Sequence, residues 1–144
     1  MSRSEHQKAL VALMAAAGRV RRQFGDVVSR HGLGSSQYNI LRILRGADGE
    51  ALPIMTIRER MLHPEPSITR LVDRLEERGL VAREPSSEDR RRVNCRLTAE
   101  GRSLVDALDE PVDRRDRELM ARLTRQELTT LRALLDKVGL TEEA

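Results

Sequence analysis

Three consecutive arginines, Arg90, Arg91 and Arg92, lie in the segment SSEDRRRVNCRLTAEG at residues 86–101. A guanidinium group donates paired hydrogen bonds in one plane, which suits phosphate oxygens and the N7 and O6 atoms of guanine. Residues 85–91 are rich in turn formers and lie between two segments typical of strands, which predicts a β-hairpin with the arginines at its tip. Two interpretations follow, a contact to nucleic acid or a solvated, charged turn.

The charge of the chain is dense rather than one-sided. The formal net charge is only +3, although 34% of the residues are charged and the sequence pI is about 9.7. Lys8 and Lys137 are the only lysines among 26 basic residues. A GC-rich genome would give the same arginine bias, so composition alone does not decide the function. Phe24 and Tyr38 are the only aromatic residues, which disfavours single-strand binding by base stacking.

Length, cysteine content and hydropathy limit the class of protein. A chain of 144 residues suits one domain that can bury a core without covalent links. Cys95 is the only cysteine, which excludes an internal disulfide and a CxxC zinc pair. No apolar run approaches the roughly 20 residues that span a bilayer, and the N-terminus lacks the apolar core of a signal peptide. We therefore expect a cytoplasmic protein with no membrane partner.

Helical periodicity dominates the first part of the chain. Apolar side chains recur as one stripe over residues 6–30, which predicts a long helix ended by the glycines of HGLGSS at 31–36. Ser36 is expected to cap the next, short helix. Residues 46–53 are expected to form a loop.

The middle of the chain has a helix-turn-helix pattern followed by a hairpin. Two short amphipathic helices are predicted at 54–62 and 66–78, with Pro66 in the first turn of the second helix and Gly79 at its end. Short strands are then predicted at 80–84 and 92–97. A helix-turn-helix followed by such a hairpin is a winged helix.

The last part of the chain returns to the helical period. Thr98 is expected to cap a long helix that bends at Pro111. Thr124 and Glu127 form a capping box at the start of a final helix. The predicted fold is therefore mainly α, an α+β winged helix in one domain, with a lobe at 36–97 between long helical extensions at 1–35 and 98–144.

The terminal helices carry more apolar surface than the small lobe can cover. A second copy of the chain would cover this surface most simply. We therefore expect 1–35 and 98–144 to be dimerisation helices in a homodimer. The alternative is that the terminal helices pack on each other within one subunit.

Two segments resemble the MarR family of bacterial transcription regulators. They are PSITRLVDRLEERGLVAR at 66–83 and the segment at 86–101, which is similar to the family's wing signature. The matching signature residues are Asp89, Arg91, Leu97, Thr98 and Gly101. The resemblance implies an obligate homodimer with interlocked terminal helices, two winged lobes and double-stranded DNA as the partner.

The predicted recognition helix at 66–78 would lie in the major groove of the DNA. Its expected outward residues are Ser67, Thr69, Arg70 and Arg74. Arg70 is the candidate for direct recognition of guanine, Ser67 and Thr69 could contact bases or phosphates, and Arg74 would contact phosphate. The alternative is a solvated helix face on which the arginines pair with acids such as Asp73.

The wing, predicted at 80–97, would place its tip at the neighbouring minor groove, whose negative potential attracts arginine. By resemblance to the family, Arg91 is the inserted residue, and Asp89 pairs with it or its neighbour and holds the tip in shape. Arg90 and Arg92 would contact phosphate or pair with Glu88. Two lobes on one dimer should then recognise a pseudo-palindromic operator with half-sites about one helical turn apart.

Catalytic, metal and redox chemistry find little support. His6, His31 and His63 lie in separate segments, and no known nucleophile, phosphate-loop or zinc-protease motif is present. The HPE stretch at 63–65 could supply one or two metal ligands, but a surface turn accounts for it better. Cys95 is expected to be a buried, inert thiol. We expect no enzyme activity, cofactor or metal.

The family resemblance also implies repressors that small phenolic or anionic ligands release from DNA. Their pocket lies between the dimer helices and the winged lobe. Residues that could line it here are Met14, Phe24, His31 and Tyr38, each of which could equally be core or surface. A competing function is a winged-helix module that binds protein or RNA, which would tolerate loss of charge in the wing and show little salt dependence.

Overall fold

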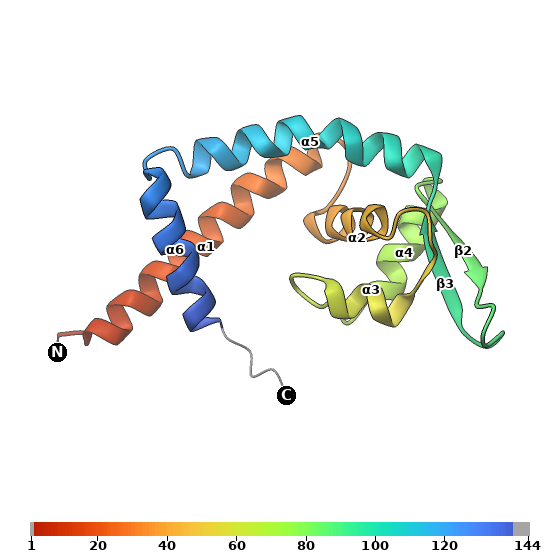
Figure 1. Ribbon diagram of the computed structural model, residues 1–144, viewed down its shortest axis with the longest axis horizontal. Helices are drawn as coiled ribbons and strands as arrows, with labels where there is room; N and C mark the ends of the chain where they lie inside the picture. Colours follow the sequence, from red (N-terminus) through yellow and green to blue (C-terminus); the bar gives the residue numbers. More distant parts are fainter. Residues whose placement is uncertain (1, 140–144) are drawn as a thin grey trace.

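The computed structural model describes residues 2–139. Its helices and strands follow one another as α1 (Glu5–Ser29), α2 (Ser35–Gly46), β1 (Leu52–Pro53), α3 (Ile54–Arg60), α4 (Ile68–Glu77), β2 (Val81–Pro85), β3 (Val93–Leu97), α5 (Ala99–Leu119) and α6 (Arg125–Val138). The lobe of α2, α3, α4 and the strands lies at one end of α5, and α6 lies at the other (Figure 1). The fold is mainly α with a winged helix, as predicted.

The sheet has three antiparallel strands in the order β1-β3-β2. β2 and β3 form the predicted hairpin, in which Val81 pairs with Leu97 and Pro85 with Val93. We expected residues 46–53 to form a loop. This prediction was partly wrong, because Leu52 pairs with Cys95 on β3. A strand of two residues has no periodicity that a sequence could reveal, and only pairing with β3 defines it.

The core lies within the lobe and extends onto α1 and α5. Helix α2 contributes Ile40 and Leu41, which are fully buried, and α5 contributes Val105 and Leu108, also fully buried. Apolar side chains of this size each contribute about 1.5–3 kcal/mol on full burial. The lobe is therefore anchored on α5 by its own core.

An ion-pair cluster strengthens the same contact between α2 and α5. Arg45 donates two hydrogen bonds to Asp109, at 2.9 Å each, and one to Asp106 at 2.8 Å. The hydrogen bond from Arg45 lowers the pKa of the Asp109 carboxyl below its usual range, although burial opposes this shift. The forked geometry of arginine fixes the orientation of α2 as well as its distance from α5.

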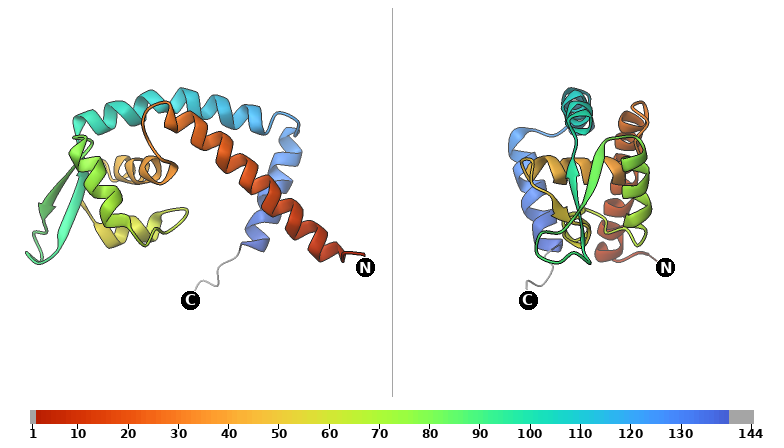
Figure 2. Two further views of the ribbon diagram at one scale, coloured as in Figure 1. Left: turned by 180° about the vertical axis from the view of Figure 1, so that it is seen from behind. Right: turned by 90° about the vertical axis from the view of Figure 1, so that its right-hand side faces the viewer.

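Helices α1 and α6 cross in one view but lie on opposite sides when the molecule is turned by 90° (Figures 1 and 2). Helix α6 buries none of its residues. Seven large apolar side chains of these two helices are exposed: Leu10, Val11, Met14, Leu128, Leu134, Leu135 and Val138. The terminal helices therefore do not cover each other's apolar faces within one chain.

Three helix starts test the predicted caps. The Thr98 side chain accepts a hydrogen bond from the Gly101 amide, and Thr124 forms the predicted capping box with Glu127. The prediction for Ser36 was wrong, because α2 begins at Ser35 with Gly34 as its N-cap. The Ser36 hydroxyl instead donates a hydrogen bond to Glu65 at 2.8 Å, a tertiary contact that local sequence does not show.

Helix α4 is shorter than the predicted 66–78. It begins at Ile68, and Pro66 and Ser67 form a turn before it, so Pro66 is not in its first turn. Ser67 has φ −101° and ψ 36° and makes no side-chain cap. The end is as predicted, because Gly79 has φ 73°, a left-handed conformation that glycine adopts without steric cost.

Gly101 lies where α5 passes close to the start of β2. A Cβ atom at this position would overlap the carbonyl oxygen of Leu80 and press on Leu97 Cδ1. The same carbonyl accepts a hydrogen bond from the Thr98 amide at 3.1 Å, so it cannot move freely. Gly101 is thus required by packing between the wing and α5.

We expect Gly101→Ala to lower the free energy of unfolding by about 3 kcal/mol, because overpacking against backbone cannot relax through a side-chain rotation. Gly46→Ala is the matched control, since a Cβ there meets nothing within 4 Å. Thermal unfolding of both variants measures the difference. Equal melting temperatures for Gly101→Ala and the wild type would contradict the packing argument.

Candidate nucleic-acid interface

The outward face of α4 and the turn before it carry the predicted contact residues. Ile68, Val72 and Leu75 point into the core, with exposures of 4%, 0% and 0%. The four predicted residues are all exposed: Ser67, Thr69, Arg70 and Arg74. A helix with this division can enter a groove without uncovering the core.

The arginines of this face are not engaged by neighbouring acids. Within residues 2–139, neither Arg70 nor Arg74 forms an ion pair. Asp73, the predicted alternative partner, pairs instead with Arg83 of β2 at 2.5 Å. The guanidinium groups of Arg70 and Arg74 are thus available for an external anion.

The wing tip is a hydrogen-bonded turn between β2 and β3. The Ser86 amide donates to the Arg92 carbonyl at 3.0 Å, and the Arg92 amide donates to the Asp89 carbonyl at 2.9 Å. The Ser86 hydroxyl is buried and accepts hydrogen bonds from the amides of Glu88 and Asp89. These bonds give the tip a defined shape, although it projects from the lobe (Figure 1).

Asp89 lies at the centre of the arginine cluster. Its Oδ1 accepts a hydrogen bond from the Arg91 amide at 3.0 Å and lies 3.4 Å from Arg91 Nε. Its Oδ2 lies 3.9 Å from Arg92 Nε, so Arg92 pairs with Asp89 rather than with Glu88. Because Asp89 holds the Arg91 backbone, it can orient that side chain without covering it.

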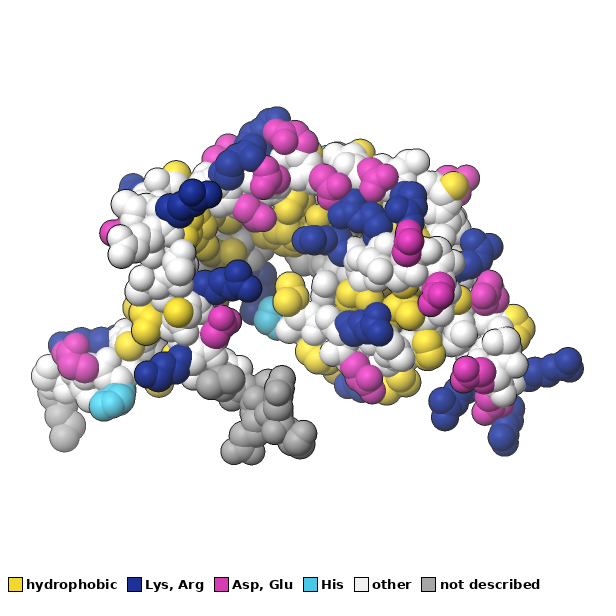
Figure 3. All heavy atoms as spheres, in the orientation of Figure 1, with side chains coloured by type: hydrophobic (Ala, Val, Ile, Leu, Met, Phe, Trp, Pro, Cys, Tyr) yellow, Lys and Arg dark blue, Asp and Glu magenta, His cyan; other side chains and the backbone are white. Residues whose placement is uncertain are grey.

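The arginines at the tip face solvent. The Arg91 side chain is 92% exposed and that of Arg92 is 76% exposed, and Arg90 is exposed as well. Basic side chains splay outward from the end of the hairpin (Figure 3). An exposed ion pair adds little to folding stability. Folding stability therefore does not account for three arginines at the wing tip.

Arg83 is a residue that the sequence analysis missed. It lies in the middle of β2 and joins the wing to α4 through Asp73 and Glu76. Arg83 is the last residue of the segment 66–83 that resembles the family, but the sequence predicts no contact for it. Only the packing of β2 against α4 brings the three residues together.

A cavity of about 480 Å³ lies between α1, α5 and the lobe. It appears as a hollow with apolar side chains in the space-filling view (Figure 3). Phe24 and Tyr38, two of the predicted pocket residues, line it, with ring centroids 5.5 Å apart. Met14 and His31 do not line it, because Met14 is 71% exposed on α1 and His31 lies after the end of that helix.

The cavity wall is basic around an apolar floor. Arg42 lies over the Tyr38 ring, 5.9 Å from its centroid, and Arg21 Nη2 lies 3.3 Å from His63 Nε2. Burial raises the pKa of Asp116, and the nearby Asp113 raises it further. Two arginines and a histidine against one acid favour a small anion with an apolar or aromatic body.

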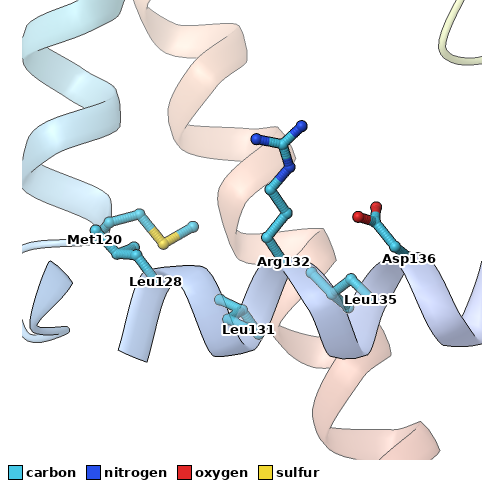
Figure 4. A pocket seen from close by; sticks show the side chains of 6 residues that line it. All are labelled: Met120, Leu128, Leu131, Arg132, Leu135 and Asp136. Carbon is cyan, nitrogen blue, oxygen red and sulfur yellow. The ribbon is translucent and has the colours of Figure 1, made fainter. Parts of the chain in front are cut away.

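A second, shallow hollow of about 300 Å³ follows the apolar face of α6. Figure 4 shows its side chains, with Arg132 and Asp136 at one edge of the leucines. The leucines and methionine that line it are Met120, Leu128, Leu131 and Leu135. A polar edge around an exposed apolar strip is typical of a protein interface.

Cys95 and the possible metal ligands are the other side chains that could carry chemistry. Cys95 is fully buried, as predicted, and burial raises the pKa of its thiol to about 11. A thiol of this kind carries almost no thiolate at neutral pH. Over residues 2–139, no three His, Cys, Asp or Glu side chains are grouped to hold a metal ion, and no helix has the length and hydropathy to cross a bilayer.

Comparisons with known proteins agree with this arrangement. A family model described as MarR family matches residues 31–92. The transcriptional regulator FarR of Neisseria gonorrhoeae is 30% identical over 143 residues, covering 99% of this chain and 97% of FarR. An E. coli MarR variant solved in complex with operator DNA is 26% identical, with a TM-score of 0.81 and coverage of 89% and 91%.

A ligand-bound structure is similar over almost the whole chain. NadR in complex with 4-hydroxyphenylacetate is 30% identical, with a TM-score of 0.75 and 99% of each chain covered. The winged-helix fold, the arginine-rich wing and the similarity over almost the whole chain all indicate the same family. This chain belongs to the MarR family of transcriptional regulators.

Proposed function

We propose that this protein is a homodimeric repressor that binds a pseudo-palindromic operator in the cytoplasm and acts by binding, without catalysis. One observation carries the proposal: Arg70 on α4 and Arg91 on the wing are both exposed on the same lobe. A helix and a hairpin tip presented together suit two adjacent grooves of one duplex.

The contacts divide between selectivity and affinity. The Arg70 fork would pair with guanine in the major groove, where such a contact is worth about 1–3 kcal/mol of discrimination. Ser67 and Thr69 would contact neighbouring bases or phosphates, and Arg74 would contact phosphate. In the wing, Arg91 would enter the minor groove while Arg90 and Arg92 contact phosphates on either side.

The second copy of the chain would cover the exposed apolar faces of α1 and α6. Seven large apolar side chains on these helices are exposed in the single chain, and the strip on α6 has the polar edge of an interface (Figure 4). A twofold axis through these helices would place two lobes on one face of the dimer. Each lobe would then contact one half-site, about 34–36 Å from the other.

The cavity beside Tyr38 is the proposed effector site. It is lined by α1 and α5 on one side and by the lobe on the other, so an occupant can change the position of the lobe relative to the dimer helices. An aromatic carboxylate fits its apolar floor and basic wall. The similar structure of NadR contains 4-hydroxyphenylacetate, which makes that compound a suitable first probe.

Excess 4-hydroxyphenylacetate should raise the melting temperature, because a ligand that binds only the native state stabilises it. The Arg42→Ala variant should lose this increase, since its guanidinium lies over Tyr38. 4-Ethylphenol is the matched probe, because it has a methyl group in place of the carboxylate. An equal increase with both compounds would contradict an anion site.

A mobility-shift titration against fragments of the source genome tests the proposal against a protein- or RNA-binding module. Arg74, Arg90 and Arg92 supply about six phosphate contacts per dimer, so affinity should fall roughly a thousandfold between 50 and 200 mM salt. One fragment should stand out from the rest at both salt concentrations. Salt-independent binding, or equal binding of single-stranded RNA, would contradict operator binding.

A further inference from the structure

Arg83 connects the wing to the recognition helix by four polar contacts. Its amide donates to Glu76 Oε2 at 2.9 Å, and its Nη1 donates to Glu76 Oε1 at 3.3 Å. Its Nη2 donates to the Thr69 carbonyl at 3.2 Å and lies 2.5 Å from Asp73 Oδ1. The one side chain therefore contacts the first turn, the middle and the last part of α4.

The position of Arg83 explains why these contacts matter for DNA. Its strand, β2, pairs with β3 at Cys95 and continues directly into the wing tip. Its side chain is only 23% exposed, whereas those of Asp73 and Glu76 are 48% and 41% exposed. The arginine thus lies between the two elements proposed to contact DNA, and its guanidinium is engaged by α4.

We infer that Arg83 is a positioning residue that fixes the recognition helix relative to the wing, so that Arg70 and Arg91 reach adjacent grooves together. This inference rests on the proposed operator binding. The planar fork of arginine holds α4 at two carboxylates and one carbonyl in a single geometry, which the single point charge of lysine cannot do.

Neutralisation of acids is the competing explanation for the same contacts. Asp73 and Glu76 are exposed carboxylates on the DNA-facing helix, and Arg83 could simply cancel their repulsion of phosphate. The two explanations differ in what they predict for lysine. Lysine keeps the positive charge but lacks the forked guanidinium. It would therefore still neutralise Asp73 and Glu76 but would not hold α4 in position.

The test measures affinity for the operator fragment and for a scrambled duplex of the same length. Arg83→Lys should lower operator affinity about tenfold or more, the effect of misplacing one bidentate base contact. Its affinity for the scrambled duplex should stay within about twofold of the wild type, because the charge is unchanged. The ratio of the two affinities is the decisive quantity, since partial unfolding would lower both equally.

Arg96→Lys is the matched control. Arg96 lies on the adjacent strand β3 and pairs with Glu84 at 3.2 Å, away from α4. This variant makes the same chemical change within the wing and should leave the affinity ratio unchanged.

A second variant, which does change the charge, separates the explanations further. Asp73→Ala with Glu76→Ala removes the side-chain acceptors of the fork but makes the helix more positive. Positioning predicts a lower ratio of operator to scrambled affinity, whereas neutralisation predicts tighter binding to both. A wild-type ratio in both this variant and Arg83→Lys would overturn the inference, while absence of operator binding by the wild type would overturn the proposed function itself.

Discussion

Arg91→Ala is expected to weaken operator binding about a hundredfold without changing the dimer or its melting temperature. Each dimer carries two wings, and loss of a charge-assisted contact worth about 1.4 kcal/mol at each gives two factors of ten. The Arg91 side chain is 92% exposed and, among residues 2–139, pairs with the partly exposed Asp89 alone, a contact that adds little to stability. Folding should therefore be independent of this residue.

Arg122→Ala is the control for net charge. Arg122 is exposed in the turn between α5 and α6. This turn lies at the end of α5 that is far from the wing (Figure 1). Its removal should alter operator affinity by less than about twofold, because surface charges beyond a Debye length of about 10 Å are screened. Equal losses for both variants would mean that the wing acts only through total charge.

Leu135→Asp is expected to convert the dimer into monomers and to weaken operator binding about a thousandfold. Leu135 lines the apolar strip of α6 and is 40% exposed in the single chain. A carboxylate there would be buried against the second copy without a partner, which is strongly unfavourable. In a dimer, binding of one lobe holds the second lobe near its half-site at an effective concentration in the millimolar range. A monomer binds a single half-site and loses this gain in affinity.

Ala133→Asp adds the same charge on the side of α6 turned away from that strip, two residues before Leu135. It should leave both assembly and affinity unchanged. Sedimentation velocity gives the assembly state, and the mobility-shift titration gives the affinity. A dimeric Leu135→Asp variant with full operator binding would remove α6 from the interface.

Most of the fold could be predicted because its local signals are strong. The apolar stripe of α4, Gly79 at its end and the alternation around Cys95 each depend on neighbouring residues alone, and all three are present in the structure. The same holds for the caps at Thr98 and Thr124. Local periodicity and turn chemistry therefore determine the order of helices and strands.

The errors share a cause in tertiary contacts. β1 exists only because Leu52 pairs with Cys95, which lies 43 residues later in the sequence. Ser36 bonds Glu65 instead of capping its own helix, and Arg83 acquires its partners only when β2 packs on α4. None of these contacts leaves a periodic signal in the sequence.

The candidate site was predicted in unequal parts. The exposed residues of α4 and the wing follow from the amphipathic pattern and the hairpin, and the structure places them on one lobe. The cavity was harder, because Phe24 and Tyr38 line it but Met14 and His31 do not. Which face of a long helix borders a cavity depends on how α1 crosses α5, and sequence spacing does not specify that angle.

In the proposed complex, one dimer contacts adjacent major and minor grooves twice, symmetrically about the operator centre. Hydroxyl-radical footprinting of the wild type and Arg91→Ala on the operator fragment tests it most directly. The wild type should protect two symmetric regions about one helical turn apart, each flanked by minor-groove protection that disappears in Arg91→Ala. A single asymmetric region would contradict symmetric binding by a dimer. Flanking protection that persists without Arg91 would contradict its insertion into the minor groove.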